Sequence, residues 1–247
     1  MVKIRAFRAT DNYGLCLKFI EGHKRVLDAV GVKQVTSSND EWAHNPGAFV
    51  ILVESDDEQK VLGGARVHAA GGSQQLPIEE ATGYMDPKIY DTVKFYSQNG
   101  TGEVCGLWNS IEVAGLGIGS IFLIRAALAI SDQIGLDSMF ALCSPYTTRI
   151  AGNYGFLVEK TLGNNGTFYY PKIDLLATAV IQKDAPNLPN ASVLETERIF
   201  DLRKRPLQKT IEQGRKQQVE IDYDLRIKSS NPLEFKFSLN NSDFKTA

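Results

Sequence analysis

A run of alternating glycines lies between a β-prone segment and an apolar helical segment, and this pattern could bind an anion. The run is Ala114-Gly115-Leu116-Gly117-Ile118-Gly119, and Ser120 follows it directly. A tight glycine turn before a helix presents unpaired backbone N–H groups and the positive end of the helix dipole, which together favour a phosphate group. Glycines at this spacing also occur in ordinary turns, so the surrounding residues decide the interpretation.

Two nucleotide-binding motifs do not fit these glycines. A Walker loop places Lys and then Ser or Thr after its last glycine, whereas Ser120 follows Gly119 and no lysine is near. A Rossmann motif needs an acidic residue at the end of the next strand, but the strand predicted there begins at Asp137 and ends at Cys143. The sequence therefore argues against both kinds of nucleotide site.

Three side chains outside the glycine run could move a proton. Glu103 lies 11 residues before Ala114 in an otherwise apolar predicted strand, where its carboxylate could accept a proton. A solvated carboxylate at the end of a strand is an equally good interpretation of Glu103. Glu112 is the second carboxylate candidate, although its predicted loop position favours solvation. His68 could relay a proton, but a lone histidine on a strand is more often structural.

These residues must be positioned by strands and helices that the periodicity of the sequence predicts. The predicted strands cover residues 2–7, 48–54, 60–68, 103–110, 137–143, 167–170, 174–181 and 219–227. The predicted helices cover residues 12–30, 86–98, 120–134 and 147–154. The order of strand, glycine turn, helix and strand forms a βαβ unit, so its two strands should be parallel within a mixed sheet. The basic segment 198–216 is expected to be a solvated helix face.

The composition of the 247 residues limits the function classes. A net charge of −2 gives no strong positive field for nucleic acid or an anionic membrane. Cys16, Cys105 and Cys143 are widely spaced, which favours free thiols in a reducing compartment, the cytoplasm by default. The N-terminal residues do not resemble a signal peptide, and the longest apolar stretch, 118–130, is too short to span a bilayer. The histidines are scattered, so no metal site is predicted.

The glycine run resembles the acyl-CoA-binding signature of the GNAT superfamily of N-acetyltransferases, Gln/Arg-x-x-Gly-x-Gly/Ala. The opening strand, long helix and hairpin follow the order of that superfamily, and Tyr154-Gly155-Phe156 stands where it often ends its fourth helix with Gly-Phe. The resemblance covers residues 1–173, with an insertion at 70–101. It implies an α/β (α+β) fold with a mixed, mostly antiparallel central sheet flanked by helices. Residues 174–247 are then a C-terminal extension that packs on or extends the same sheet.

The resemblance implies that an acetyl or other acyl group moves from CoA to a primary amine by direct attack. The amides of the glycine run would bind the CoA pyrophosphate, and the pantetheine arm would lie between the strands that end near Asn109 and Cys143. Glu103 stands at the spacing of the strand glutamate base in the histone-acetylating branch. The implied cosubstrate contacts are Trp108, Asn109, Ser110, Gly115, Leu116, Gly117, Ile118, Gly119 and Ser120.

Two positions depart from the pattern of the superfamily. Ala114 replaces the Gln or Arg that opens the signature, which removes a side chain but keeps the backbone amides. Ala151 stands four residues before Gly155, where many members have a tyrosine as general acid. Tyr154 and Tyr146 are the nearby substitutes, although each is more often a packed aromatic.

Two alternatives to acetyl transfer stay open from the sequence. One is a synthase of N-acyl amino acids or acyl-homoserine lactones, with long acyl donors held by the insertion and the extension. The other is a CoA-binding module without catalysis, because Ala114 and Ala151 depart from the pattern. The expected partner is a small-molecule amine acceptor, with acetyl-CoA or another acyl-CoA as cosubstrate and no metal, nucleic acid or membrane; a homodimer stays open.

Overall fold

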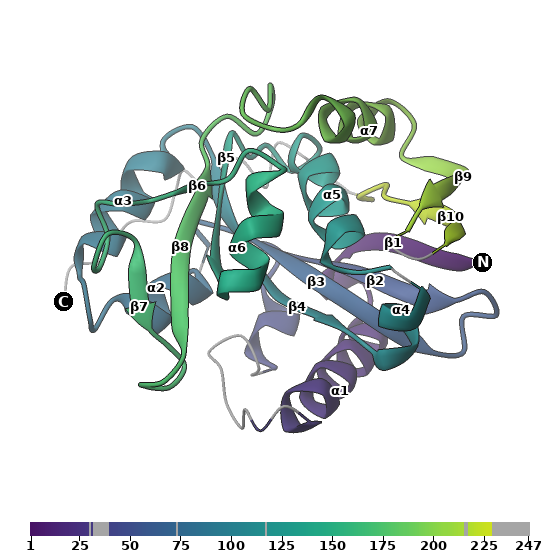
Figure 1. The fold of residues 1–247 in the computed structure, drawn as a ribbon, viewed down its shortest axis with the longest axis horizontal. Helices are drawn as coiled ribbons and strands as arrows, with labels where there is room; N and C mark the ends of the chain where they lie inside the picture. Colours follow the sequence, from purple (N-terminus) through teal and green to yellow (C-terminus); the bar gives the residue numbers. More distant parts are fainter. Residues whose placement is uncertain (30, 32–39, 73, 117, 215–216, 229–247) are drawn as a thin grey trace.

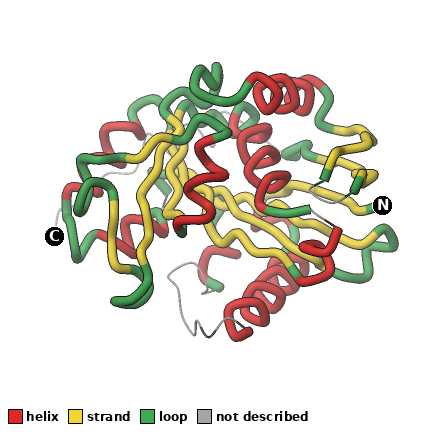
Figure 2. The backbone as a smooth tube through the Cα atoms, viewed as in Figure 1, coloured by secondary structure: helices red, strands yellow, loops and turns green. Residues whose placement is uncertain are grey.

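A computed structural model of the chain shows one large sheet with helices on both faces (Figure 1, Figure 2). It describes all residues except 30, 32–39, 73, 117, 215–216 and 229–247. The strands are β1 (Val2–Arg8), β2 (Ala48–Ser55), β3 (Val61–Ala69), β4 (Thr101–Asn109), β5 (Ser138–Cys143), β6 (Leu157–Val158), β7 (Thr167–Tyr169), β8 (Leu176–Gln182), β9 (Leu207–Gln213) and β10 (Gln218–Asp224). The helices are α1 (Tyr13–Ala29), α2 (Pro77–Thr82), α3 (Lys88–Ser97), α4 (Ile111–Leu116), α5 (Ser120–Ser131), α6 (Pro145–Gly152) and α7 (Val193–Lys204), with 3-10 helices η1 (Ala9–Asp11) and η3 (Glu41–His44).

The sheet is mixed and mostly antiparallel. Over the described part of the chain its ten strands run in the order β6-β8-β5-β4-β3-β2-β1-β10-β9, and β7 also pairs with β8. The pairs β4–β5 and β1–β10 are parallel, and the other pairs are antiparallel. The βαβ unit and the fold class predicted from the sequence are therefore confirmed.

The two faces of the sheet carry different helices (Figure 1). One apolar cluster joins α5, α6 and α7 to the sheet, and it includes Val104 of β4. On the other face α1 packs in one cluster and α2 and α3 pack in a second. Because side chains alternate along a strand, Glu103 and Cys105 point to the face that α1 and α2 cover.

Helix α1 approaches the sheet closely where it crosses Trp108. Its buried side includes Phe19, whose ring packs edge-on against the Trp108 ring at 5.9 Å between centroids. Gly22 lies against the same indole, and a Cβ at this position would overlap the ring. The closeness of the helix to β4 thus depends on the missing side chain of Gly22.

The variant Gly22→Ala is expected to lower the free energy of unfolding by about 1–3 kcal/mol, because the overlap forces the helix or the indole to move. The matched control is Gly14→Ala in the same helix, where a Cβ would lie 3.7 Å from Asn12 Oδ1. That exposed position should gain up to about 1 kcal/mol from the helix propensity of alanine. Urea unfolding measures both, and equal effects at the two glycines would contradict the close packing.

Two expectations from the sequence are wrong. The segment expected to be a glycine turn is helical up to Leu116, because the Ser110 hydroxyl accepts the Val113 N–H at 3.3 Å and starts α4. The helix expected over the basic segment 198–216 ends at Lys204, since Pro206 disfavours helical geometry before it, and β9 follows. Within the described residues, no helix has the length and hydropathy to cross a membrane.

Candidate active site

Strands β4 and β5 pair only near their beginnings. Their register joins residues 101–103 to residues 138–140. Strand β4 then carries a bulge, because its register with β3 shifts between Gly64 and Arg66. Gly106 has φ +56 within this bulge, a backbone conformation that glycine adopts most easily. Since a bulge bends its strand, β4 turns away from β5 beyond this point.

A cavity of about 550 Å³ fills the space between the two diverging strands. Residues 103–107 and 141–143 form its central walls, with side chains of α1 and α2 from one face and of α5 and α6 from the other. The loop between β7 and β8 closes a further side. Among the described lining residues, Glu103 and Asp174 bring carboxyl groups and His23 brings an imidazole. Most of the other lining side chains are apolar.

Glu103 is a buried carboxyl group in the cavity wall, with 2% of its surface exposed. Its Oε2 accepts a hydrogen bond of 2.6 Å from the Ile78 N–H in the first turn of α2. Burial raises the pKa of Glu103 to about 8, against the lowering effects of the Ile78 amide and the Arg66 cation. A carboxyl group in this state can gain or lose a proton near neutral pH, as a general base requires.

His23 reaches the same cavity from α1, and the sequence analysis did not single it out as a functional residue. The side chain is 5% exposed, and burial, assisted by the Arg66 cation, lowers the pKa of His23 to about 4. The imidazole is therefore neutral at pH 7. The signal in the sequence was its position four residues after Phe19, on the buried side of the predicted helix, where apolar residues are expected.

His68 and Arg66 lie on β3 behind the cavity. His68 pairs with Glu103 across the strands, but it does not line the cavity, and burial lowers its pKa well below the usual value. Arg66 is fully buried, with its guanidinium 4.1 Å from the centre of the Trp42 ring. A Cβ at Gly106 would lie 2.9 Å from Arg66 Nε, so the glycine also makes room for this cation.

The two tyrosines predicted as general acids lie outside the cavity lining. Tyr154 is buried, and its hydroxyl donates a hydrogen bond of 2.8 Å to the carbonyl of Ile121 in the first turn of α5. Burial raises the pKa of Tyr154, which makes it a poorer acid. Tyr146 is 58% exposed on α6. The structure brings neither hydroxyl to Glu103.

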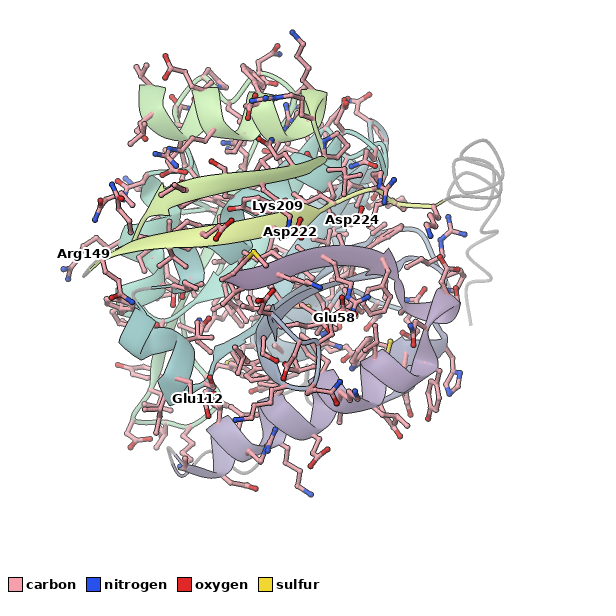
Figure 3. The ribbon with its side chains drawn as sticks, turned by 90° about the vertical axis from the view of Figure 1, so that its right-hand side faces the viewer. Glu58, Glu112, Arg149, Lys209, Asp222 and Asp224 are labelled. Atoms are coloured by element: carbon pink, nitrogen blue, oxygen red, sulfur yellow. The ribbon has the colours of Figure 1, made fainter. Side chains whose placement is uncertain are left out.

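The residues predicted at the end of β4 lie beside the cavity but not in its lining. Trp108 is buried beneath α1, and its indole N–H has no hydrogen-bond partner in the described part of the chain. Asn109 pairs with Gly63 of β3, and Ser110 starts α4. Glu112 lies on α4 (Figure 3), and its exposed carboxylate is 3.9 Å from Lys60 Nζ. The lining residues of β4 are instead 103–107.

The beginning of α5 is the place where the glycines predict an anion site. Gly119 precedes the helix with φ −138 and ψ −159, and no side chain caps the helix there. A Cβ at Gly119 would meet no atom within 4 Å, so there is open space beside this residue. Ile118 is buried and Ser120 is half-buried. Gly115 and Leu116 end α4, whereas Gly117 lies outside the described residues.

Nowhere in the described ranges do three His, Cys, Asp or Glu side chains lie close enough together to hold a metal ion.

No family model and no curated protein matches the sequence of this chain. Solved structures do match. FeeM, an N-acyl amino acid synthase from uncultured soil microbes, aligns with a TM-score of 0.57 and 13% identity over 80% of this chain and 98% of that one. BjaI, a CoA-dependent acyl-homoserine lactone synthase solved with SAM and isopentyl-CoA, aligns with a TM-score of 0.54 and 11% identity over 96% and 100%.

A third solved structure extends the likeness. TofI, in a ternary complex with an inhibitor and MTA, aligns with a TM-score of 0.52 and 9% identity over 79% of this chain and 96% of that one. At such identities the likeness concerns the arrangement of strands and helices and not the reaction. The chain therefore has the GNAT-like fold that its glycine run and element order predict.

Proposed function

We propose that this chain transfers an acyl group from an acyl-CoA to a primary amine. The observation that carries the proposal is the cavity between β4 and β5, which has the buried carboxyl group of Glu103 in its wall. The uncapped beginning of α5 supplies backbone amides for a pyrophosphate. The names of FeeM as an N-acyl amino acid synthase and of BjaI as a CoA-dependent synthase support the same reaction class.

In the proposed complex the part of the glycine run that follows α4, up to Ser120 of α5, binds the pyrophosphate, and the pantetheine arm follows the gap between the strands. The thioester then lies beside residues 103–107 of β4, which line the cavity. Trp108, Asn109 and Ser110 stay proposed neighbours of the cosubstrate. Trp108 would act through its packing beneath α1, since it does not line the cavity.

The chemical step joins the amine nitrogen to the carbonyl carbon of the thioester and breaks the carbon–sulfur bond. An amine attacks only when its lone pair is free, so a base must first take a proton from the ammonium form. The carboxylate of Glu103 takes this proton. After the attack the nitrogen carries one proton more than the amide product, and this proton passes through water to the leaving thiolate of CoA, because Tyr154 and Tyr146 do not line the cavity.

The cavity lining favours a second candidate, in which the donor carries an acyl chain longer than acetyl. Its walls include Leu27, Pro77, Leu107, Leu142 and Phe156, which suit an apolar chain. A series of acyl-CoA donors, with acetyl, butanoyl, octanoyl and dodecanoyl groups, separates the two candidates. A kcat/KM that rises with chain length supports the long-chain synthase, and a maximum at acetyl supports the acetyltransferase.

The variant Gly119→Glu is expected to weaken CoA binding by at least about 10-fold, since a carboxylate placed at the beginning of α5 repels the pyrophosphate. A Cβ at this position meets no atom within 4 Å, so the fold should be unchanged. Gly119→Ala tests the loss of the glycine alone, and Gly152→Glu adds the same charge at another glycine with open space. Isothermal titration with CoA measures all four proteins.

The outcomes of that titration also separate catalysis from binding. No CoA binding to the unaltered chain at millimolar concentration contradicts the proposed function. Binding without turnover over a broad panel of primary amines indicates a binding module.

The proposal also places the chain in the cytoplasm, where acyl-CoA is available and where the free, buried thiols of Cys16, Cys105 and Cys143 stay reduced.

A further inference from the structure

Two polar side chains share the half of the cavity that α1 and α2 cover. Glu103 points to this face because it alternates with Val104, which packs on the opposite face. The Ile78 N–H of α2 holds one oxygen of Glu103 on the same side. His23 lines the cavity from α1. A molecule that enters this half of the cavity therefore meets one carboxyl group and one imidazole.

The imidazole of His23 is available to such a molecule. It is 5% exposed and makes no hydrogen bond with any residue in the described ranges; its nearest aromatic neighbour is Phe19, with ring centroids 6.0 Å apart. His68 differs, because its Nε2 is buried without a hydrogen-bond partner in the described ranges and the residue does not line the cavity. A buried polar group without a partner is costly, so a hydrogen bond with a ligand would explain why His23 faces the cavity.

The chemistry of a primary amine suits this pair of acceptors. When Glu103 takes one proton from the ammonium form, the lone pair that is set free first faces the carboxyl group, so the neutral amine must turn before it attacks. The turned nitrogen keeps two N–H groups, one lone pair and its organic substituent. One N–H can donate to the carboxyl group of Glu103 and the other to the unprotonated nitrogen of a neutral imidazole. With both N–H groups held, the lone pair has only one direction left. Orientation of this kind accelerates a direct attack on a thioester.

We propose that His23 binds the acceptor, accepting a hydrogen bond from the second N–H of a primary amine and so aiming the lone pair at the thioester. The inference rests on the proposed acyl transfer and adds the selection of primary over secondary amines. A secondary amine has no N–H for His23 once Glu103 has been satisfied. The preference for a primary amine should therefore depend on the imidazole.

The test compares hydroxylamine with N-methylhydroxylamine, two small nucleophiles that differ by one N–H. The donor is the acyl-CoA with the highest kcat/KM in the series above, and the product is measured by mass spectrometry above the rate without enzyme. His23→Leu removes the acceptor and keeps an apolar volume. His23→Asn and His23→Gln each put an amide oxygen near one of the two ring nitrogens. His44→Leu is the control, since His44 is exposed and stacks on Tyr13 outside the cavity lining.

His23→Leu should lower kcat/KM for hydroxylamine by about 10-fold, the effect of one lost hydrogen bond, and change that for N-methylhydroxylamine less than about 3-fold. The Kd for CoA should stay unchanged, and one of the two amide variants should restore most of the rate. Equal losses with both nucleophiles, no loss with either, or weaker CoA binding in His23→Leu would overturn the role of His23. A wild-type chain that binds no CoA, or that transfers no acyl group, would instead overturn the proposed function.

Discussion

Replacing Glu103 by glutamine is expected to lower kcat/KM for acyl transfer by about 10²–10⁴-fold, the usual contribution of a general base. Glutamine keeps an oxygen that can accept the Ile78 N–H, which now lies 2.6 Å from Glu103 Oε2, so α2 should keep its anchor. Only the ionised carboxylate can take a proton. Because burial raises the pKa of Glu103 to about 8, the wild-type rate should rise with pH and level off above that value.

The variant Glu103→Gln should lose that limb of the profile, which is measured as kcat/KM from about pH 6 to about pH 9.5. Glu112→Gln is the control, since the exposed carboxylate of Glu112 faces Lys60 on the surface and its loss should change the rate less than about 2-fold. Glu103→Ala should be worse than Glu103→Gln, because it also leaves the Ile78 amide without its acceptor. A profile that is the same in wild type and Glu103→Gln excludes the base role.

The same substitution should change stability with pH. The pKa of Glu103 is raised above the usual glutamate value of 4.5, so the folded state binds the proton more tightly than the unfolded state does. Wild type therefore loses stability from this group as pH rises through the window between those two values, and the loss is complete above a pH of about 8. Glu103→Gln has no such loss, so its free energy of unfolding relative to wild type should improve over the same window.

Replacing Arg125 by leucine is expected to lower the free energy of unfolding by about 3–5 kcal/mol, because it leaves buried carboxylates without their cation. Arg125 on α5 is 3% exposed and donates to Glu195 of α7 at 2.8 and 2.9 Å. Its Nη1 also lies 3.1 Å from Glu212 Oε1 of β9, an ion pair that lacks hydrogen-bond geometry. Arg198 contacts the same Glu212 and offsets part of the loss there.

A surface pair of the same kind provides the control for Arg125→Leu. Arg205 is paired with Asp201 one helical turn away, and its side chain is 62% exposed, so Arg205→Leu should cost about 0.5 kcal/mol or less. Leucine at Arg125, Glu195 and Glu212 together should recover much of the lost stability, because the buried carboxylates are then gone and Arg198, which loses Glu212, is 30% exposed to solvent. Urea unfolding distinguishes these cases. A cost for Arg125→Leu no greater than that of the control would show that the buried cluster contributes little.

Local periodicity explains how much of the fold could be predicted. The β-prone runs at 48–54 and 60–68 and the helical spacing after Asn12 are signals carried by neighbouring residues, and β2, β3 and α1 formed where these signals lie. Helix α2 was missed because its six residues are too few for a periodic signal. Strand β9 was missed because its side chains are mostly exposed, so its alternation carries little hydrophobic contrast.

The site was less predictable than the fold because it depends on contacts between distant segments. Glu103 could be named from its spacing to the glycine run, but its burial comes from α2, which the sequence did not predict. The cavity depends on a bulge at Gly106, and no residue pattern around that glycine marks the bulge. His23 looked like a core position of α1, and only the divergence of β4 from β5 gives it a cavity to face.

The parallel pairing of β1 with β10 bears on the order in which the chain can fold. Val2 pairs with Ile221, so nearly the whole chain separates the two partners, and Figure 3 shows Lys209 and Asp222 side by side on the two strands that complete this edge. During synthesis β1 can pair with β2 at once, but its other edge stays open until β10 has left the ribosome. An open edge of this kind is prone to aggregate. Expression of the chain should therefore depend on chaperones, and a nonsense mutation just before β9 should yield insoluble protein although the cavity residues are all present.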